Sequence, residues 1–196
     1  MSSRDQVTRT RILIAAMKLM ARHDGKGVRM GDIAKAAGIS RQAVYLHFSS
    51  RAELLEATTK HMDGDLKLEE RLRPSRNAES GRVRLAAYIE FWGSYLPEIY
   101  SVARAILCVK DTDEAAASAW RERMAAHRDG CRAAIEALHH DGELTQEWSV
   151  DQAIDCLWTL LSVRNWEQLT QDCGWSEKAY VQRLKQIANR TFIKNS

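Results

Sequence analysis

Two neighbouring side chains, Arg41 and Gln42, could hydrogen-bond to the edges of DNA bases, and they directly follow a serine, Ser40. Arginine can pair with guanine and glutamine with adenine, so these residue types near the start of a helix suit base recognition in the major groove. Tyr45 lies about one helical turn further on and would share their face. This chemistry requires a helix that presents these side chains to solvent.

The surrounding residues have the pattern of two short helices that cross. Gly38 would close the turn between them in the left-handed conformation, and the Ser40 hydroxyl would cap the second helix. The stretch Gly27–Leu55 therefore indicates a helix–turn–helix, although such helix pairs also occur in all-α proteins that never bind nucleic acid. The apolar residues that would face one another in this pair are Ile33, Ala37, Ile39, Val44 and Phe48.

The charge of the chain is distributed unevenly. Residues 1–51 contain ten Lys and Arg against three Asp and Glu, a formal charge of +7. The whole chain carries +3, so residues 52–196 carry −4. Positive charge is thus concentrated on the helix–turn–helix segment, as contacts with DNA phosphates require.

Residues 31–55, GDIAKAAGISRQAVYLHFSSRAELL, resemble the DNA-binding region of the tetracycline-repressor (TetR) family of bacterial transcriptional regulators. The resemblance extends from a helix beginning near Asp5 to the start of a fourth helix at Arg51. It implies that Tyr45, His47 and Arg51 grip phosphates, while Arg41 and Gln42 contact bases. The residues expected at the DNA are Arg29, Ser40, Arg41, Gln42, Tyr45, His47 and Arg51.

Two positions depart from the family pattern. Leu46 stands where the family commonly has a second aromatic residue, which puts one phosphate contact in doubt. Arg29 replaces a threonine that usually caps the first helix of the motif, so that cap must come from elsewhere. Arg29 could itself reach a phosphate.

Length and composition favour an all-α fold with an N-terminal three-helix domain at 1–50 and a larger helical ligand-binding and dimerisation domain at 51–196. Strand-like alternation is absent, and the chain of 196 residues has only two prolines. Pro74 is expected to end one helix and Pro97 to interrupt another. The helices expected after the motif are 50–72, 80–96, one that follows a short break at Pro97 and ends near Asp111, 112–140, 150–171 and 176–193.

The four cysteines do not have the spacing of a metal or redox site. Cys108, Cys131, Cys156 and Cys173 form no CxxC or CxH pair, and cysteine often serves as a small hydrophobic residue, so they are expected to be reduced thiols without a sensing role. No metal and no cofactor is expected. The basic and apolar N-terminus lacks a cleavage site and no stretch could span a membrane, so we expect a cytoplasmic protein without a membrane partner.

Apolar stripes on the last two expected helices exceed what one partner helix needs. The family resemblance implies that these helices form a four-helix bundle with a second subunit, and a twofold dimer would place two recognition helices on a palindrome. The alternative is that the stripes belong to the core of a single chain. The residues expected at the dimer interface are Ile154, Leu157, Leu161, Tyr180, Leu184 and Ile187.

All six tryptophans lie after residue 90. By analogy with the family, some of them would line a pocket for a small-molecule effector, although core packing also explains them. His127 shares the apolar side of its helix with Trp120 and Met124, and a lone histidine there is often a core residue. The residues expected to bind the effector are Trp92, Trp120, Met124, His127 and Trp158.

Together these observations predict a homodimeric repressor that an effector releases from a palindromic operator. An enzyme is disfavoured, because the sequence offers no paired carboxylates at a plausible site, no nucleophile with a partner base and no phosphate-binding loop. A protein-interaction adaptor that keeps the motif only as a scaffold is the other alternative, and it would bind no DNA.

Overall fold

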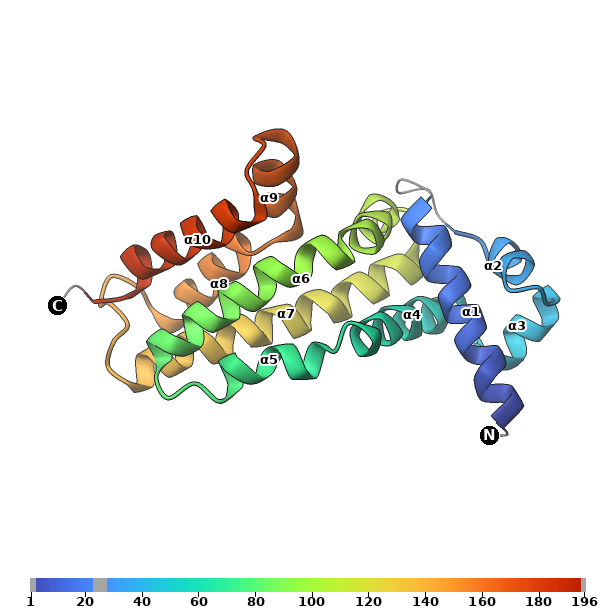
Figure 1. Ribbon diagram of the computed structural model, residues 1–196, viewed down its shortest axis with the longest axis horizontal. Helices are drawn as coiled ribbons and strands as arrows, with labels where there is room; N and C mark the ends of the chain where they lie inside the picture. The colour runs from blue at the N-terminus through green and yellow to red at the C-terminus, as the bar shows by residue number, and fades with distance from the viewer. Residues whose placement is uncertain (1–2, 23–27, 195–196) are drawn as a thin grey trace. The chain divides into compact units, whose positions relative to one another are not determined.

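The structure is a computed structural model that describes residues 3–22 and 28–194, so Gly27 of the predicted motif lies outside the described residues. All regular elements in these ranges are helical, which confirms the all-α fold class (Figure 1). An isolated antiparallel bridge joins Leu144 to Ile193. The helices are α1 (Ser3–Arg22), α2 (Met30–Ala36), α3 (Arg41–His47), α4 (Arg51–Asp65), α5 (Leu68–Arg76), α6 (Gly81–Val109), α7 (Glu114–His140), α8 (Val150–Leu160), α9 (Val163–Glu167), the π-helical turn η1 (Gln168–Asp172) and α10 (Glu177–Phe192).

The chain forms two compact units, each made from two separate stretches of sequence. The first unit contains the described residues up to Lys67 together with Ile99–Arg123. The second contains Leu68–Glu98 and the described residues from Met124 onward. Both α6 and α7 contribute residues to each unit. The functional division predicted at residue 50 stays a prediction.

The core of the first unit joins the helix–turn–helix to residues that lie far away in sequence. Val44 and Phe48 are fully buried, as their place in the apolar pattern predicts. They pack in a cluster that also contains Val102, Ile106 and Ala119 from α6 and α7. Burying apolar surface contributes about 25 cal/mol per Å², so these long-range contacts help to stabilise the motif.

The core of the second unit uses the residues that the sequence suggested for a dimer interface. Five of the six are buried within the single chain, so they belong to the intramolecular core that sequence analysis left as the alternative. Their stripes look broad because α8 and α10 pack against each other and against the rest of the unit. Only Ile187, which is 39% exposed, remains available to a partner. The five buried residues are Ile154, Leu157, Leu161, Tyr180 and Leu184.

Several helix boundaries differ from the expected ones. The helix expected over 50–72 is two helices, because Lys67 has φ +53° and interrupts the hydrogen-bond pattern between α4 and α5. Pro74 lies inside α5, which continues to Arg76. Pro97 lies inside α6 rather than in a break. The carbonyl of Ser94, in the turn before this proline, accepts a hydrogen bond from Arg71 Nη2 at 2.9 Å.

The helix expected over 150–171 ends early, at Leu160. A new helix, α9, begins after Ser162, whose hydroxyl accepts a hydrogen bond from the Asn165 amide at 3.1 Å. The carbonyls freed by the break also have donors: Asn165 Nδ2 bonds to Leu160 O at 2.6 Å, and Trp92 Nε1 bonds to Leu161 O. Polar side chains therefore satisfy this helix end, as buried backbone groups require.

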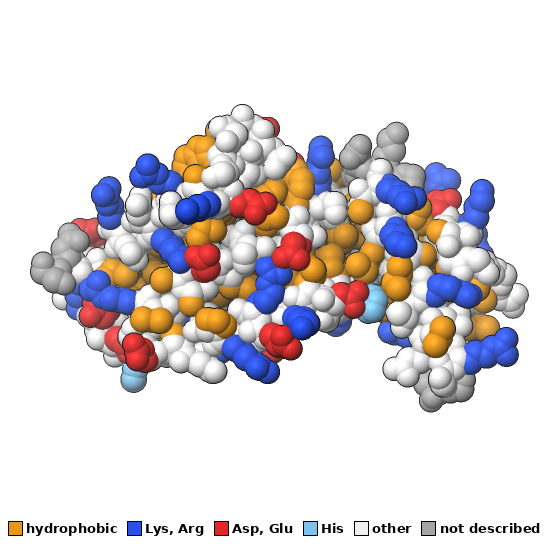
Figure 2. Space-filling view, in the orientation of Figure 1, with side chains coloured by type: hydrophobic (Ala, Val, Ile, Leu, Met, Phe, Trp, Pro, Cys, Tyr) orange, Lys and Arg blue, Asp and Glu red, His pale blue; other side chains and the backbone are white. Residues whose placement is uncertain are grey.

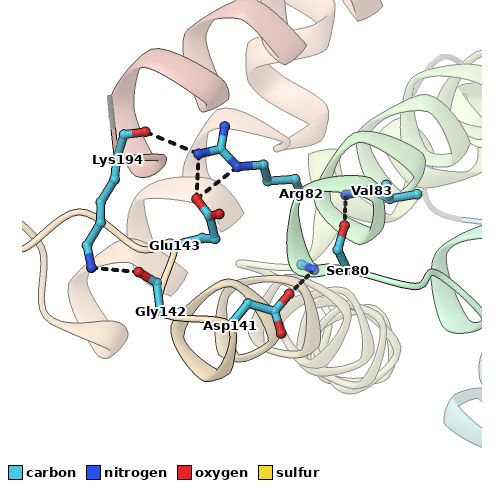
Figure 3. A network of polar contacts seen from close by, with 8 residues as sticks. Ser80, Arg82, Val83, Asp141, Gly142, Glu143 and Lys194 are labelled. Carbon is cyan, nitrogen blue, oxygen red and sulfur yellow. Dashed lines mark hydrogen bonds and ion pairs between the residues drawn. The ribbon is translucent and has the colours of Figure 1, made fainter. Parts of the chain in front are cut away.

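A polar network holds the end of the second unit where α6 begins (Figure 3). Asp141 accepts a hydrogen bond from the Gly81 amide at 2.6 Å, and Arg82 forms an ion pair with Glu143. Lys194 closes the network, because its Nζ donates to Gly142 O at 2.6 Å and its carbonyl accepts from Arg82. The start of α6, the α7–α8 connection and the end of the described chain are thus joined.

Candidate nucleic-acid interface

The turn between α2 and α3 has the conformation that its sequence predicts. Gly38 adopts φ +66°, in the left-handed region that favours glycine. The Ser40 hydroxyl accepts a hydrogen bond from the Ala43 amide at 3.1 Å and so caps α3. This cap fixes where α3 begins and therefore which of its side chains face outward.

Helix α3 presents the predicted base-contacting residues to solvent. Arg41 and Gln42 are exposed, and the Arg41 guanidinium lies 5.8 Å from the centre of the Tyr45 ring. Tyr45 is 42% exposed and Leu46 is 83% exposed. Because Leu46 is so exposed, its side chain does not contribute to the core. Its apolar side chain also cannot donate a hydrogen bond to a phosphate. Contact of Arg41 and Gln42 with bases stays a prediction.

A hollow of about 670 Å³ lies beside α2 and α3 within the first unit. Its lining includes three arginines, Arg29, Arg41 and Arg51, the two aspartates Asp32 and Asp113, and Tyr45. We call it the α2–α3 hollow. Cationic and phenolic donors in one depression suit an anion such as a DNA phosphate.

Arg29 begins α2 without acting as a side-chain cap. Its carbonyl accepts hydrogen bonds from the Asp32 amide at 3.0 Å and the Ile33 amide at 3.1 Å, but no side-chain cap bond is formed at this residue. The Arg29 side chain is exposed. Its predicted contact with phosphate is untested.

Arg51, predicted to grip a phosphate, is already engaged by other residues of the chain. Its Nε donates to Val28 O at 2.8 Å, and its Nη1 forms an ion pair with Asp113. Sequence analysis missed Asp113, which lies 62 residues away. The residues around Asp113 indicate only the start of a helix, and in the structure Asp113 Oδ1 accepts a hydrogen bond from the Ala116 amide at 3.1 Å.

The start of α4 is capped independently of Arg51. Ser50 accepts a hydrogen bond from the Glu53 amide at 3.1 Å. Glu53 reaches back to Ser49, accepting from its hydroxyl at 2.7 Å and from its amide at 2.8 Å. The two hydrogen bonds from Ser49 lower the pKa of Glu53, and the one from the Ser49 hydroxyl has the larger effect. His47, at the end of α3, is half-buried close to this cap in sequence.

Helix α4 is joined to α7 by further polar contacts within the first unit. Ser118 donates to Glu56 at 2.9 Å, Lys60 pairs with Glu122 at 2.8 Å, and Asp63 pairs with Arg123 at 2.6 Å. Residue numbers rise together on both helices, so α4 and α7 run in the same direction along this contact. Helix α4, which follows α3, is thus fixed to α7 by side-chain polar groups.

The five residues predicted to bind an effector do not all belong to one unit. Trp120 packs against the core of the first unit. The other four belong to the second unit, where Trp92 and His127 are buried and Met124 and Trp158 are half-buried. Neither the α2–α3 hollow nor a groove of about 460 Å³ beside Arg71 and Lys185 is lined by any of the five. Their role in ligand binding stays a prediction.

The basic character of the first unit is visible on its surface. Figure 2 shows Lys and Arg side chains gathered over α1, α2 and α3, at the right of the view, with few acidic side chains among them. Within residues 3–22 and 28–194, no three His, Cys, Asp or Glu side chains are grouped so that they could hold a metal ion. In the same ranges, no helix is both long and apolar enough to cross a membrane.

Comparison with known proteins connects this geometry to a family. The model of bacterial regulatory proteins of the tetR family matches residues 12–58. The HTH-type transcriptional regulator AcrR of Shigella flexneri is 41% identical over 49 residues, which are 25% of this chain and 23% of AcrR. The sequence match therefore spans about a quarter of each protein.

Solved structures share the fold over nearly the whole chain. A transcriptional regulator from Saccharomonospora viridis in complex with choline has a TM-score of 0.76 at 20% identity, over 97% of this chain and 100% of that one. NalD, the secondary repressor of the MexAB-OprM multidrug efflux pump in Pseudomonas aeruginosa, has a TM-score of 0.73 at 20% identity, over 98% and 99%. FadR from Bacillus subtilis, in complex with stearoyl-CoA, has a TM-score of 0.73 at 17% identity, over 91% and 96%.

The match over α1 to α4 falls on the residues that build the capped turn and its exposed helix. Residues 12–58 are thus similar to the tetR family of bacterial regulatory proteins, and the chain as a whole shares the fold of solved transcriptional regulators.

Proposed function

We propose that the protein is a homodimeric repressor that binds a palindromic operator and is released from it by a small molecule bound in the C-terminal region. The observation that carries the proposal is the exposed face of α3, where Arg41 and Gln42 follow a capped turn in a segment of net charge +7. A recognition helix of this kind inserts its first residues into the major groove.

The α2–α3 hollow would receive the DNA backbone beside that helix. Arg29 and Tyr45 line it and can donate hydrogen bonds to phosphate oxygens. Such contacts fix the register of a protein on DNA without reading sequence, whereas Arg41 and Gln42 would supply the sequence preference.

A dimer would double these contacts on a twofold axis. Half-sites would lie about 34 Å apart or a multiple of that distance, as two copies of α3 facing one side of the duplex require. The outward side of α10, where Ile187 is exposed, is the part of the predicted interface that remains free of the intramolecular core.

An effector site in the second unit is supported by buried donors and by the relatives. Trp158 Nε1 and the Tyr180 hydroxyl are buried, and no hydrogen-bond partner for either lies within the described residues. Buried polar atoms of this kind are normally satisfied by protein, water or ligand. The regulators crystallised with choline and stearoyl-CoA bind small molecules in the same fold.

Selection of duplex DNA from a random pool by the purified protein tests the proposal. We expect a palindromic consensus, bound with an affinity that falls steeply as salt rises, since each neutralised phosphate contributes about −0.9 to the slope of log K against log salt. Loss of binding on adding a small molecule that itself binds the protein would extend the result to the effector. Recovery of no enriched sequence and no salt-dependent binding would overturn the proposal.

A further inference from the structure

We propose that Asp113 takes the place of a DNA phosphate at Arg51 and thereby sets the affinity of the protein for DNA. The inference rests on the proposed function, because it concerns an arginine beside the expected DNA surface. Asp113 has no part in the predicted DNA contacts, and its carboxylate acts against them.

The geometry places the two groups within one hollow. Arg51 and Asp113 both line the α2–α3 hollow, along with Arg29, Arg41 and Tyr45. Nη1 of Arg51 is paired with Oδ2 of Asp113, while the neighbouring Nε is bonded to Val28 O. The side chains are 21% and 27% exposed, so the pair is partly withdrawn from solvent but still borders the hollow.

Carboxylate and phosphate oxygens use the same donors of a guanidinium. An arginine that holds a carboxylate through Nη1 offers fewer donors to a phosphate, and its charge is already neutralised. Of the three arginines in the hollow, Arg51 alone has a carboxylate partner recorded among the described residues. The hollow therefore holds two arginines ready for DNA and one that must first exchange its partner.

Asp113 is itself held in place by α7. Its second oxygen, Oδ1, accepts the Ala116 amide at 3.1 Å, so the carboxylate moves with the start of that helix. Glu56, Lys60 and Asp63 fix α4 to α7 along the same line. A displacement at the start of α7 would change both the position of Asp113 and its hold on Arg51, which makes this ion pair a place where DNA affinity can be adjusted.

The test compares Asp113→Asn with a control, Glu122→Gln, which removes the same charge from α7 outside the hollow and leaves the Ser118–Glu56 and Arg123–Asp63 contacts between α4 and α7 in place. Asparagine can still accept the Ala116 amide and so preserves the cap. With the duplex selected from the random pool, we expect D113N to bind about three- to tenfold more tightly, with a salt slope steeper by about one phosphate contact. E122Q should change affinity by less than about twofold.

A second comparison, made in an Arg51→Gln background, tests whether the effect of D113N on DNA affinity depends on Arg51. In an Arg51→Gln background, adding D113N should leave affinity and salt slope as they are in R51Q alone. Circular dichroism melting of each variant checks that folding is retained.

Three results would overturn the inference. D113N could bind no more tightly than E122Q, or more weakly than the wild type, which would mean that Asp113 orients Arg51 for DNA. The gain could also persist in R51Q, which would make it a general charge effect. If the wild type and every variant fail to bind DNA, the proposed function falls together with the inference, and that pattern is distinct from wild-type binding with an unchanged D113N.

Discussion

The indole ring of Trp92 stacks on the imidazole of His127, with ring centres 3.9 Å apart and planes inclined by only 8°. The same indole donates to Leu161 O at the break between α8 and α9, and Tyr88 meets His127 Nδ1 from another side at 3.0 Å. The imidazole is therefore a structural part of the second unit, whether or not a ligand also reaches it.

This burial predicts a specific dependence of stability on pH. Burial lowers the pKa of His127 from 6.5 to about 3, because the charged imidazolium is poorly solvated there. Between these values the unfolded chain binds a proton that the folded chain does not. Stability is therefore lost as pH falls below about 6.5, by up to about 1.4 kcal/mol per pH unit from this residue.

His127→Phe separates this contribution from that of the carboxylates. Phenylalanine keeps an aromatic ring against Trp92 and leaves Tyr88 its bond to the backbone carbonyl of residue 127, at 3.1 Å in the wild type. Urea unfolding at pH 7, 6 and 5 should show the wild type losing about 2 kcal/mol more than H127F by pH 5. Parallel losses in the two proteins would contradict the assignment.

Gly130 predicts a second destabilising change in this cluster. A Cβ added there would lie 2.2 Å from the Tyr88 hydroxyl oxygen and 2.5 Å from the ring carbon that carries it. Tyr88 is buried and bonded to His127, so it cannot easily move aside. Gly130→Ala should lower the free energy of unfolding by about 1–3 kcal/mol, measured by urea denaturation.

Gly64 provides the matched control. It also lies inside a helix, but a Cβ added there has no atom within 4 Å. Gly64→Ala should raise the free energy of unfolding by about 0.5–1 kcal/mol, because alanine restricts the unfolded chain and favours the helix. Equal effects of the two substitutions would show that the space around Gly130 is not the deciding factor.

Arg41 and Tyr45 should affect DNA binding in different ways. Arg41→Ala should weaken binding to the selected duplex by about 1–3 kcal/mol and relax the base preference at one position of each half-site. Tyr45→Phe removes only a hydroxyl at the hollow, so it should weaken binding to all duplexes alike. Repeating the random-pool selection with each variant measures both effects, and indistinguishable consensus sequences would refute this division of roles.

Ile187 tests the proposed dimer without disturbing the core. Ile187→Asp places a charge on the exposed side of α10 and should shift the protein from dimer to monomer in sedimentation velocity, with its helical content unchanged. Asn189→Asp, at another exposed position of α10, should leave the dimer intact. Dissociation by both variants, or by neither, would remove Ile187 from the interface.

The helix–turn–helix could be predicted from sequence because its determinants are local. Gly38 and Ser40 act on the residues next to them, and the alternation of buried and exposed side chains on α3 follows from helical periodicity. The pairing of Arg51 with Asp113 could not be predicted in this way, because nothing near Arg51 indicates which distant acid reaches it.

The C-terminal helices show what helical periodicity cannot predict. The apolar stripes that contain Leu157 on α8 and Leu184 on α10 indicate that one face of each helix is buried, but not which surface covers it. Here the same chain covers both faces. Pro97 also lies inside a helix, α6, where the sequence predicted an interruption, so a proline alone does not determine where a helix ends.

The composition of the first unit has a consequence for protein synthesis. Its apolar core contains Ile12 and Phe48 near one end of the sequence, and Ile106 and Ala119 near the middle. A ribosome delivers these residues in order, at about 5–20 per second, so the early helices must wait several seconds for the later ones. The DNA-binding helices thus reach their final packing only after more than half of the chain has been made, and a nascent chain stalled before residue 99 would expose the apolar surface that α6 and α7 later cover.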